Sequence, residues 1–260
     1  MRFLLTIVKT TDPQGFIPLN YQYELSAWIY KTINLANADF AEWLHSKGYS
    51  GKKRQFKLFT FSQLNIPEYR IEKNRLRIIS EEISLILSFF PAEITENFVA
   101  GIFQNQKLIL GNKNIKTEFV VQRAEKLANP SFSDDMHFRL LSPLHLTLKN
   151  HDNTRRIDHL HPDHPEYSRV FFNNLADKNH ALGKPARYEP EACKLEVTGR
   201  LRSKLITIKS QTSGQTKLKG YLFDFRAKAP AELLRTGYYA GFGKSNALGF
   251  GCAETITSKK

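Results

Sequence analysis

Hydrophobic positions in the first half of the chain alternate between the spacing of a strand and the spacing of a helix. The pattern predicts strands at 3–9, 57–63, 74–80, 107–110 and 115–124, one helix after the turn at 10–18, and a long helical region at 81–104 that Pro91 interrupts. This β-α-β-β-α-β order is that of a ferredoxin-like domain.

The first predicted helix has a buried stripe and a separate flank. Leu25, Ile29 and Ile33 recur every four residues, as the buried face of a helix requires. Tyr30 lies roughly 100° from the centre of this stripe, on a flank that it shares with Tyr23. The phenol of Tyr30 is therefore expected outside the core stripe.

A second helix is predicted to restart at the segment Asn37-Ala-Asp39. Asn20 is placed to cap the first helix, and Asp39 precedes Glu42 at the spacing of a capping box. Gly48 is well placed to end the second helix, which puts His45 on its flank and in its last turn.

Residues 43–67 contain no acidic side chain. The basic residues of this stretch are Lys47, Lys52, Lys53, Arg54 and Lys57. Such a run is typical of a solvated loop, but it also follows a histidine that lies off the helix core.

The second half repeats the order of the first. After a linker at 129–131, the pattern predicts a strand at 136–149, a helix at 165–181, long strands at 193–209 and 216–229 joined by a turn at 210–215, a short helix at 230–240 and a last strand at 250–257. We therefore predict an α+β chain of two tandem ferredoxin-like (RRM-like, βαββαβ) domains, at 1–128 and 129–260.

Composition points to a polyanionic partner. The 260 residues carry a formal net charge of +13 with a pI near 9.7, which favours nucleic acid. No apolar run approaches the roughly 20 residues that span a bilayer, so a membrane partner is not expected. Cys193 and Cys252 form no CxxC pattern, and we expect a cytoplasmic protein without a disulfide framework.

The hairpin at 193–229 is rich in cations. They are Arg200, Arg202, Lys204, Lys209, Lys217 and Lys219. Alternation places Arg200, Arg202 and Lys204 on one face, as a strand that follows phosphates would need. An exposed face that only confers solubility explains these residues equally well.

A glycine-rich segment at 241–251 lies between the short helix and the last strand. Phosphate-binding glycine loops follow a strand and open a helix, so the reversed order here argues against the Walker and dinucleotide-binding types. A tightly packed closing turn is the structural alternative.

One motif suggests a metal site. His159, His161, Asp163 and His164 match the HxHxDH pattern of metallo-β-lactamase-type hydrolases, and imidazole and carboxylate are suitable zinc ligands. Only His180 follows among the histidines, whereas that fold needs further downstream ligands, so a polar loop is the favoured interpretation.

Catalysis without a metal needs a proton carrier, an orienting group and a cation near the developing charge. His45, Tyr30 and Lys57 supply these residue types, although a lone histidine is more often structural.

The glycine segment has the form GhGxxxxxGhG, in which h is apolar. The matching positions are Gly241, Phe242, Gly243, Gly249, Phe250 and Gly251. With the preceding residues 233–238 and the N-terminal layout, this motif makes the whole chain resemble the CRISPR-associated endoribonucleases of the RAMP superfamily, which cut precursor crRNA within its repeats.

The N-terminal motif of those enzymes has a Tyr on the first helix, a later His, and a Lys just before a Leu-Phe-Thr strand. Tyr30, His45 and Lys57 match these positions. The segment before Lys57 is longer than in the family pattern, so the cationic role could instead belong to Lys52 or Lys53.

The resemblance implies a metal-independent reaction without a cofactor, in which a 2′-hydroxyl attacks the adjacent phosphate. His45 would act as general acid or base, Tyr30 would position or deprotonate the 2′-hydroxyl, and Lys57 would stabilise the transition state. Precursor crRNA is the expected partner, with other CRISPR-associated effector subunits as possible further partners. The alternative is a repeat-binding protein or effector subunit of the same fold that does not cut.

The residues predicted to bind RNA are Lys52, Lys53, Arg54, Arg200, Arg202, Lys204, Lys209, Gly241, Gly243, Lys244, Ser245, Asn246, Gly249 and Gly251.

Overall fold

The computed structural model describes residues 1–10, 15–52, 54–112, 115–149, 156–157, 159–184, 188–210 and 212–256. Its helices are α1 (Gln22–Ala36), α2 (Ala38–Ser46), α3 (Ala92–Gln104), α4 (Tyr167–Ala181) and α5 (Ala231–Ala240), with 3-10 turns η1 (Pro190–Ala192) and η2 (Asn246–Leu248). Among the described residues, no helix is long and apolar enough to cross a membrane.

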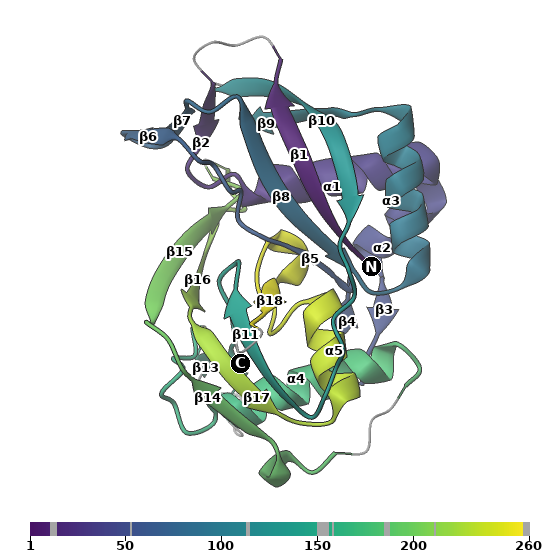
Figure 1. Cartoon of the computed structure of the whole chain (residues 1–260), viewed down its shortest axis with the longest axis vertical. Coiled ribbons are helices and arrows are strands. Elements are labelled where there is room, and N and C mark those ends of the chain that lie inside the picture. Colours follow the sequence, from purple (N-terminus) through teal and green to yellow (C-terminus); the bar gives the residue numbers. More distant parts are fainter. Residues whose placement is uncertain are drawn as a thin grey trace.

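The N-terminal domain is built on an antiparallel sheet with the strand order β5-β8-β1-β10-β9 (Figure 1). These strands are β1 (Arg2–Lys9), β5 (Phe59–Phe61), β8 (Glu82–Phe89), β9 (Lys107–Gly111) and β10 (Lys116–Lys126). Helices α1 and α3 pack against each other, with the rings of Trp28 and Phe98 5.7 Å apart. The first and third strands of the βαββαβ unit, β1 and β8, lie beside each other inside the sheet.

The helix predicted for residues 81–90 is wrong, because this segment forms β8. Ile83, Leu85, Leu87 and Phe89 alternate with Ser84, Ile86 and Ser88, and the first four are all buried. Strands β1 and β5 pair with its two edges, and α5 of the other domain contacts it. This period of two is short, has Ile86 among its polar positions and is followed at once by the helix α3, so the sequence pattern favoured one longer helical region.

The strand predicted at 74–80 forms but lies outside this sheet. It is β7 (Arg75–Ile78), which pairs with β2 (Phe16–Pro18) and β6 (Tyr69–Glu72) in a separate three-stranded sheet. Two very short strands, β3 (Tyr49–Ser50) and β4 (Gln55–Phe56), form a hairpin after α2.

The C-terminal sheet has the order β14-β17-β11-β18. Its strands are β14 (Lys194–Val197), β17 (Asp224–Lys228), β11 (Asp135–Leu140) and β18 (Ala253–Thr255). With α4 and α5 this is a second ferredoxin-like unit, so the prediction of tandem domains is confirmed (Figure 1). The boundary predicted at 128/129 falls between β10 and β11 and stays a prediction.

All four predicted strands of this domain are shorter than expected, and the last, predicted at 250–257, is β18 (Ala253–Thr255). The two long ones each break in two, leaving β14 and β17 in the sheet and β15 (Arg202–Ile208) with β16 (Thr216–Leu222) in a separate ribbon. The strand predicted at 136–149 ends at Leu140 and is followed by isolated bridges, such as that of His145 to Lys244, before β12 (Leu148–Lys149) pairs with β13 (Arg156–Ile157). The chain leaves the sheet after β14 and returns to it at β17, and the ribbon between them contacts the N-terminal domain through Thr207 and Asn20.

Both predicted helix caps are wrong. Helix α1 starts after Tyr21, and Asn20 instead accepts a hydrogen bond from the backbone N–H of Thr207 in β15. In α2 the cap is Asn37, whose side chain accepts from the N–H of Phe40, and not Asp39. Asn20 therefore forms a contact between the two domains instead of capping the first turn of α1.

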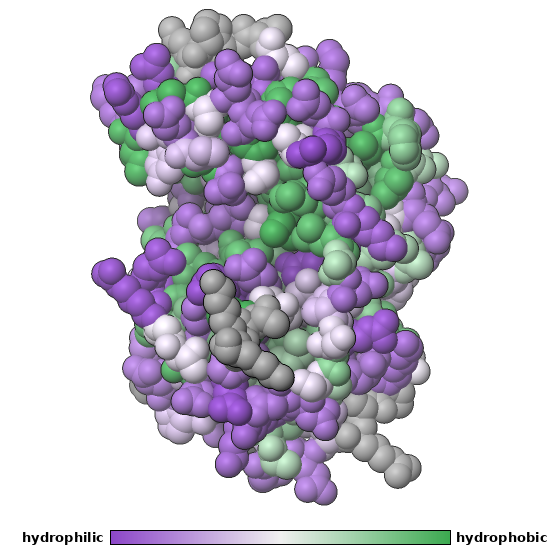
Figure 2. All heavy atoms as spheres, viewed as in Figure 1, coloured by the Kyte–Doolittle hydropathy of each residue, from purple (hydrophilic) through white to green (hydrophobic). Residues whose placement is uncertain are grey.

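Buried contacts join the two domains at the start of the chain and at β8. The guanidinium of Arg2 lies 4.0 Å from the ring of Tyr238 and donates to the Cys252 sulfur, and Ser88 donates to the carbonyl of Tyr239. Figure 2 shows mainly hydrophilic residues on this face, with hydrophobic ones gathered near its middle, and an outline that narrows between the two halves.

Candidate functional site

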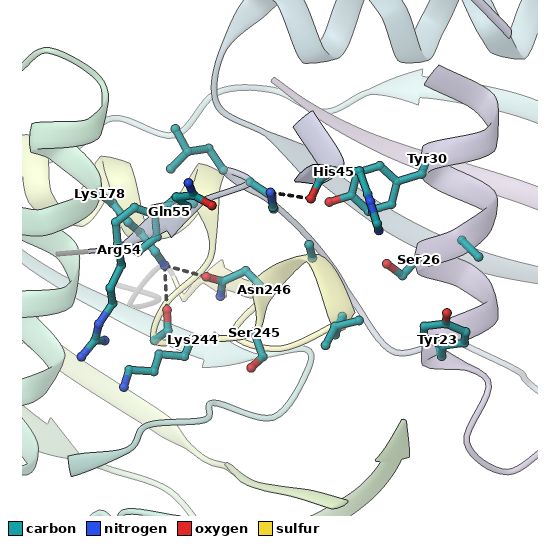
Figure 3. A pocket seen from close by; sticks show the side chains of 17 residues that line it. Tyr23, Ser26, Tyr30, His45, Arg54, Gln55, Lys178, Lys244, Ser245 and Asn246 are labelled. Carbon is teal, nitrogen blue, oxygen red and sulfur yellow. Dashed lines mark hydrogen bonds between the residues drawn. The ribbon is translucent and has the colours of Figure 1, made fainter. Parts of the chain in front are cut away.

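A cavity of about 800 Å³ lies where the N-terminal domain meets the glycine-rich loop (Figure 3). Helix α1, the end of α2, the segment leading to β5 and the loop all contribute to its wall. The polar residues that line it are Tyr23, Ser26, Tyr30, His45, Arg54, Gln55, Lys57, Lys178, Lys244, Ser245 and Asn246.

Tyr30 and His45 are neighbours on one side of this cavity (Figure 3). Their ring centroids are 5.1 Å apart and the planes are perpendicular. His45 is exposed in the last turn of α2, whereas Tyr30 is partly buried and also packs on Phe59. Burial raises the pKa of Tyr30 well above its usual range, so the phenol keeps its proton and can donate a hydrogen bond.

Lys57 is held beside His45 by a backbone contact. Its Nζ donates to the His45 carbonyl oxygen at 2.7 Å, and burial lowers its pKa. Gly48 makes room for this arrangement. A Cβ at Gly48 would lie 2.6 Å from the Phe56 carbonyl oxygen and 3.1 Å from Lys57 Cδ, and its φ of +67° also favours glycine.

The other basic residues of the segment lie differently. Arg54 lines the cavity, whereas Lys52 is exposed and donates its backbone N–H to the side chain of Asp177. Lys53 lies outside the described residues. Of the two described lysines considered for the cationic role, Lys52 and Lys57, it is Lys57 that lies on the cavity wall beside His45.

The four motif glycines are required by the packing of the loop. Gly241, Gly243, Gly249 and Gly251 all have positive φ angles, of 88°, 70°, 80° and 73°. A Cβ at Gly251 would lie 1.8 Å from the Phe242 carbonyl oxygen, and one at Gly249 would lie 2.5 Å from the Phe61 ring. The loop is thereby held against β5, where Thr60 donates to the Phe250 carbonyl.

The three polar residues between the glycine pairs have different environments. Lys244 donates to the Thr147 carbonyl at 3.3 Å and also bonds its hydroxyl. Ser245 lines the cavity in the left-handed conformation, with φ of +59°. Asn246 is buried, and its amide donates to the carbonyls of Phe242 and Phe250, so its side chain closes the loop.

Lys178 was not among the residues predicted for the site, but it is 1 % exposed and reaches the centre of the loop from α4. Phe171 and Leu175 precede it at helical spacing and are both fully buried. A lysine that continues an apolar stripe is the signal that would have revealed it.

The cations of the β15–β16 ribbon do not share the cavity. Arg200 and Arg202 are exposed, and Lys204 is partly buried, which lowers its pKa. Ile206 and Ile208 continue the alternating face of Arg202 and Lys204 but are buried. Elsewhere on the ribbon, Lys209 lies 5.9 Å from the centre of the Tyr23 ring.

Within the HxHxDH motif, His161 Nδ1 lies 3.4 Å from a carboxylate oxygen of Asp163, but the three histidines have different partners. His159 accepts from the N–H of Lys219, His161 packs on Tyr221, and His164 accepts from the N–H of Glu166. Over the part of the chain that the structure describes, no group of three His, Cys, Asp or Glu residues is arranged to hold a metal ion.

Comparison with known proteins gives consistent matches over the chain. The N-terminal model of CRISPR-associated protein Cas6 matches residues 16–125 and the C-terminal model matches residues 125–255. A protein of Methanocaldococcus jannaschii described as CRISPR-associated endoribonuclease Cas6 1 is 31 % identical over 96 % of this chain and 91 % of its own length.

Solved structures agree. One described as CRISPR associated protein Cas6 is 30 % identical, with a TM-score of 0.74 over 99 % of both chains. The product of a Cas6-related gene from Pyrococcus furiosus has a TM-score of 0.83 over 100 % of this chain and 99 % of its own, at 22 % identity, and supports the fold. The N-terminal and C-terminal family models match the two halves of the chain, and the relative from Methanocaldococcus jannaschii matches along most of its length. This chain therefore belongs to the CRISPR-associated protein Cas6 family.

Proposed function

We propose that this chain is a metal-independent endoribonuclease that cuts CRISPR repeat RNA within precursor crRNA. One observation carries the proposal. Tyr30 and His45 line one side of a cavity across from Lys244 and Ser245 of the glycine-rich loop (Figure 3), and Lys57, which also lines it, donates to the His45 carbonyl. Relatives described as CRISPR-associated endoribonucleases support the substrate class.

In the proposed reaction the 2′-hydroxyl oxygen attacks the adjacent phosphorus while the bond from phosphorus to the 5′-oxygen breaks. The products are a 2′,3′-cyclic phosphate and a 5′-hydroxyl. One proton leaves the nucleophile and one reaches the leaving oxygen, so the site must accept and donate protons. His45, exposed at the cavity, acts as the general acid or base.

Tyr30 and Lys57 assist this chemistry. The protonated phenol of Tyr30 orients the 2′-hydroxyl or a phosphate oxygen by a hydrogen bond. Lys57 uses one N–H to bond the His45 carbonyl, and the two remaining N–H groups of its ammonium stabilise the charge that develops on the phosphate. Arg54, Lys244 and Ser245 bind the RNA backbone around the cavity.

The test is cleavage of labelled repeat RNA by wild-type protein and His45→Ala, each with and without EDTA. We expect His45→Ala to lower the single-turnover rate by about 10²- to 10⁴-fold, the range typical of a general acid or base, and EDTA to have no effect. His137→Ala, on β11 outside the cavity lining, is the matched control.

Three outcomes contradict this mechanism. Loss of cleavage in EDTA would point to a metal ion, and full activity of His45→Ala would remove His45 from the reaction. Binding without cleavage by the wild-type protein would identify a repeat-binding protein instead. RNA with a 2′-deoxy nucleotide before the cut should also be resistant, because the nucleophile is missing.

A further inference from the structure

Lys178 places a buried ammonium inside the glycine-rich loop. Its Nζ donates to the carbonyl oxygens of Gly241 and Gly243, the latter at 2.8 Å, and to the side-chain oxygen of Asn246 at 2.7 Å (Figure 3). An ammonium has three N–H donors, so these bonds use all of them. Burial also lowers the pKa of Lys178 well below its usual range.

This arrangement costs free energy that an apolar residue would avoid. All three partners are neutral oxygens, which compensate a buried charge less well than a carboxylate would. Phe171 and Leu175 occupy the same face of α4 and are fully buried. What the ammonium provides is order, because one atom fixes two carbonyls and the side chain that closes the loop.

The preceding residue contacts the opposite segment of the site. An oxygen of the Asp177 side chain accepts from the N–H of Lys52 at 3.3 Å, and a Cβ on Gly51 would lie 2.9 Å from the Asp177 carbonyl oxygen. The ring of Phe56 lies 6.0 Å from Lys178 Nζ. Consecutive residues of α4 therefore contact the segment that leads to Lys57 and the loop that carries Lys244 and Ser245.

We propose that Lys178 is a positioning residue that, together with Asp177, holds these two sides of the cavity in register. The inference rests on the proposed function, because it concerns where the RNA backbone lies relative to His45 and Lys57. A shift of about 1 Å in such a site can reduce a rate by 10²-fold, so a loosened loop should slow the reaction even when all the RNA is bound.

The experiment measures single-turnover cleavage at saturating repeat RNA with Lys178→Ala. This change removes three carbons and the ammonium of a side chain that lines the open cavity. Propylammonium has the same three carbons and ammonium and can fill the space that they leave. We expect a rate about 10- to 100-fold below wild type, recovery of much of it with propylammonium, and none with 1-propanol, which has the same length but no charge. Lys184→Ala, an exposed lysine just after α4, should cleave like wild type.

Lys178→Met fills the same space without a donor and should be slow and unaffected by the amine. Wild-type rates for Lys178→Ala at saturating RNA would overturn the proposal, and so would a slow, folded Lys178→Ala that propylammonium does not rescue.

If wild-type protein does not cleave, the proposed function fails but this inference is still tested. Amide hydrogen exchange in residues 241–251 should be faster in Lys178→Ala and slowed again by propylammonium, and unchanged exchange would refute it.

Discussion

At the scale of single residues, the charge states of Tyr30 and Lys57 decide what each can do. Burial raises the pKa of Tyr30 and so keeps its phenol neutral, which favours positioning over deprotonation among the roles considered for it. Burial lowers the pKa of Lys57, which brings the loss of its charge closer to neutral pH. The fall in cleavage rate at alkaline pH should therefore reflect the deprotonation of Lys57.

The pH dependence of single-turnover cleavage tests this assignment. Lys57 is cationic below its folded-state pKa and loses its charge as the pH rises through that value. Because this pKa is depressed, the rate should begin to fall at a lower pH than an ordinary lysine would allow. In Lys57→Arg the guanidinium stays charged, so the decline should move to higher pH. An identical alkaline decline in both proteins would assign it to another group.

At the scale of elements, the glycine-rich loop is shaped by close packing. The four motif glycines have positive φ angles and lie where a Cβ would meet backbone, Asn246 or Phe61. Two residues with side chains, Leu58 and Ser245, also adopt positive φ at the cavity, with values of 53° and 59°. Such strain costs roughly 1 kcal/mol or more per residue and persists only where the surrounding structure enforces it.

Comparing Gly251→Ala with Gly183→Ala separates the stability lost to steric overlap from the stability lost to an unfavourable φ angle. The new Cβ would lie 1.8 Å from the Phe242 carbonyl oxygen, so the loop must shift, and we expect the free energy of unfolding to fall by about 3 kcal/mol. Gly183→Ala is the matched control, because Gly183 has a similar φ of +71° but no atom within 4 Å of the added Cβ. It should lose about 1 kcal/mol. Equal losses in urea unfolding would show that packing is unimportant.

At the scale of the whole molecule, contacts between distant parts of the chain make the two domains one unit. Arg2 in the first strand is 2 % exposed and contacts Tyr238 and Cys252, while Thr60 and Ser88 donate to the loop and to α5. The cavity is formed by both domains, so their association positions the site as well as stabilising the fold.

Calorimetry of Arg2→Ala tests this coupling. We expect one unfolding transition for wild type, and for the variant one transition at lower temperature, with about 3 kcal/mol less stability from the lost packing and hydrogen bond. Arg70→Ala, an exposed arginine of β6, should leave the transition unchanged. If Arg2→Ala instead gave two separate transitions, the domains would be independent units that Arg2 merely links.

The amino-acid sequence determined the features that depend on local spacing. Tyr30 and His45 lie on helix flanks as the periodicity predicted, and the glycine spacing identified the loop because only glycine adopts these φ angles in so little space. The tandem βαββαβ order also followed from local patterns, although 81–90 was assigned to a helix.

Only the tertiary structure decided what depends on burial by distant segments. Strand β8 alternates only over a short stretch, and its pairing with β1 and β5 is what separates it from the helix that follows. Lys178 bonds carbonyls more than sixty residues away, and no local pattern encodes those partners. Lys57 was chosen over Lys52 because the fold places its ammonium beside His45. Local chemistry names the candidate residues, but packing across the two domains selects which of them share one cavity.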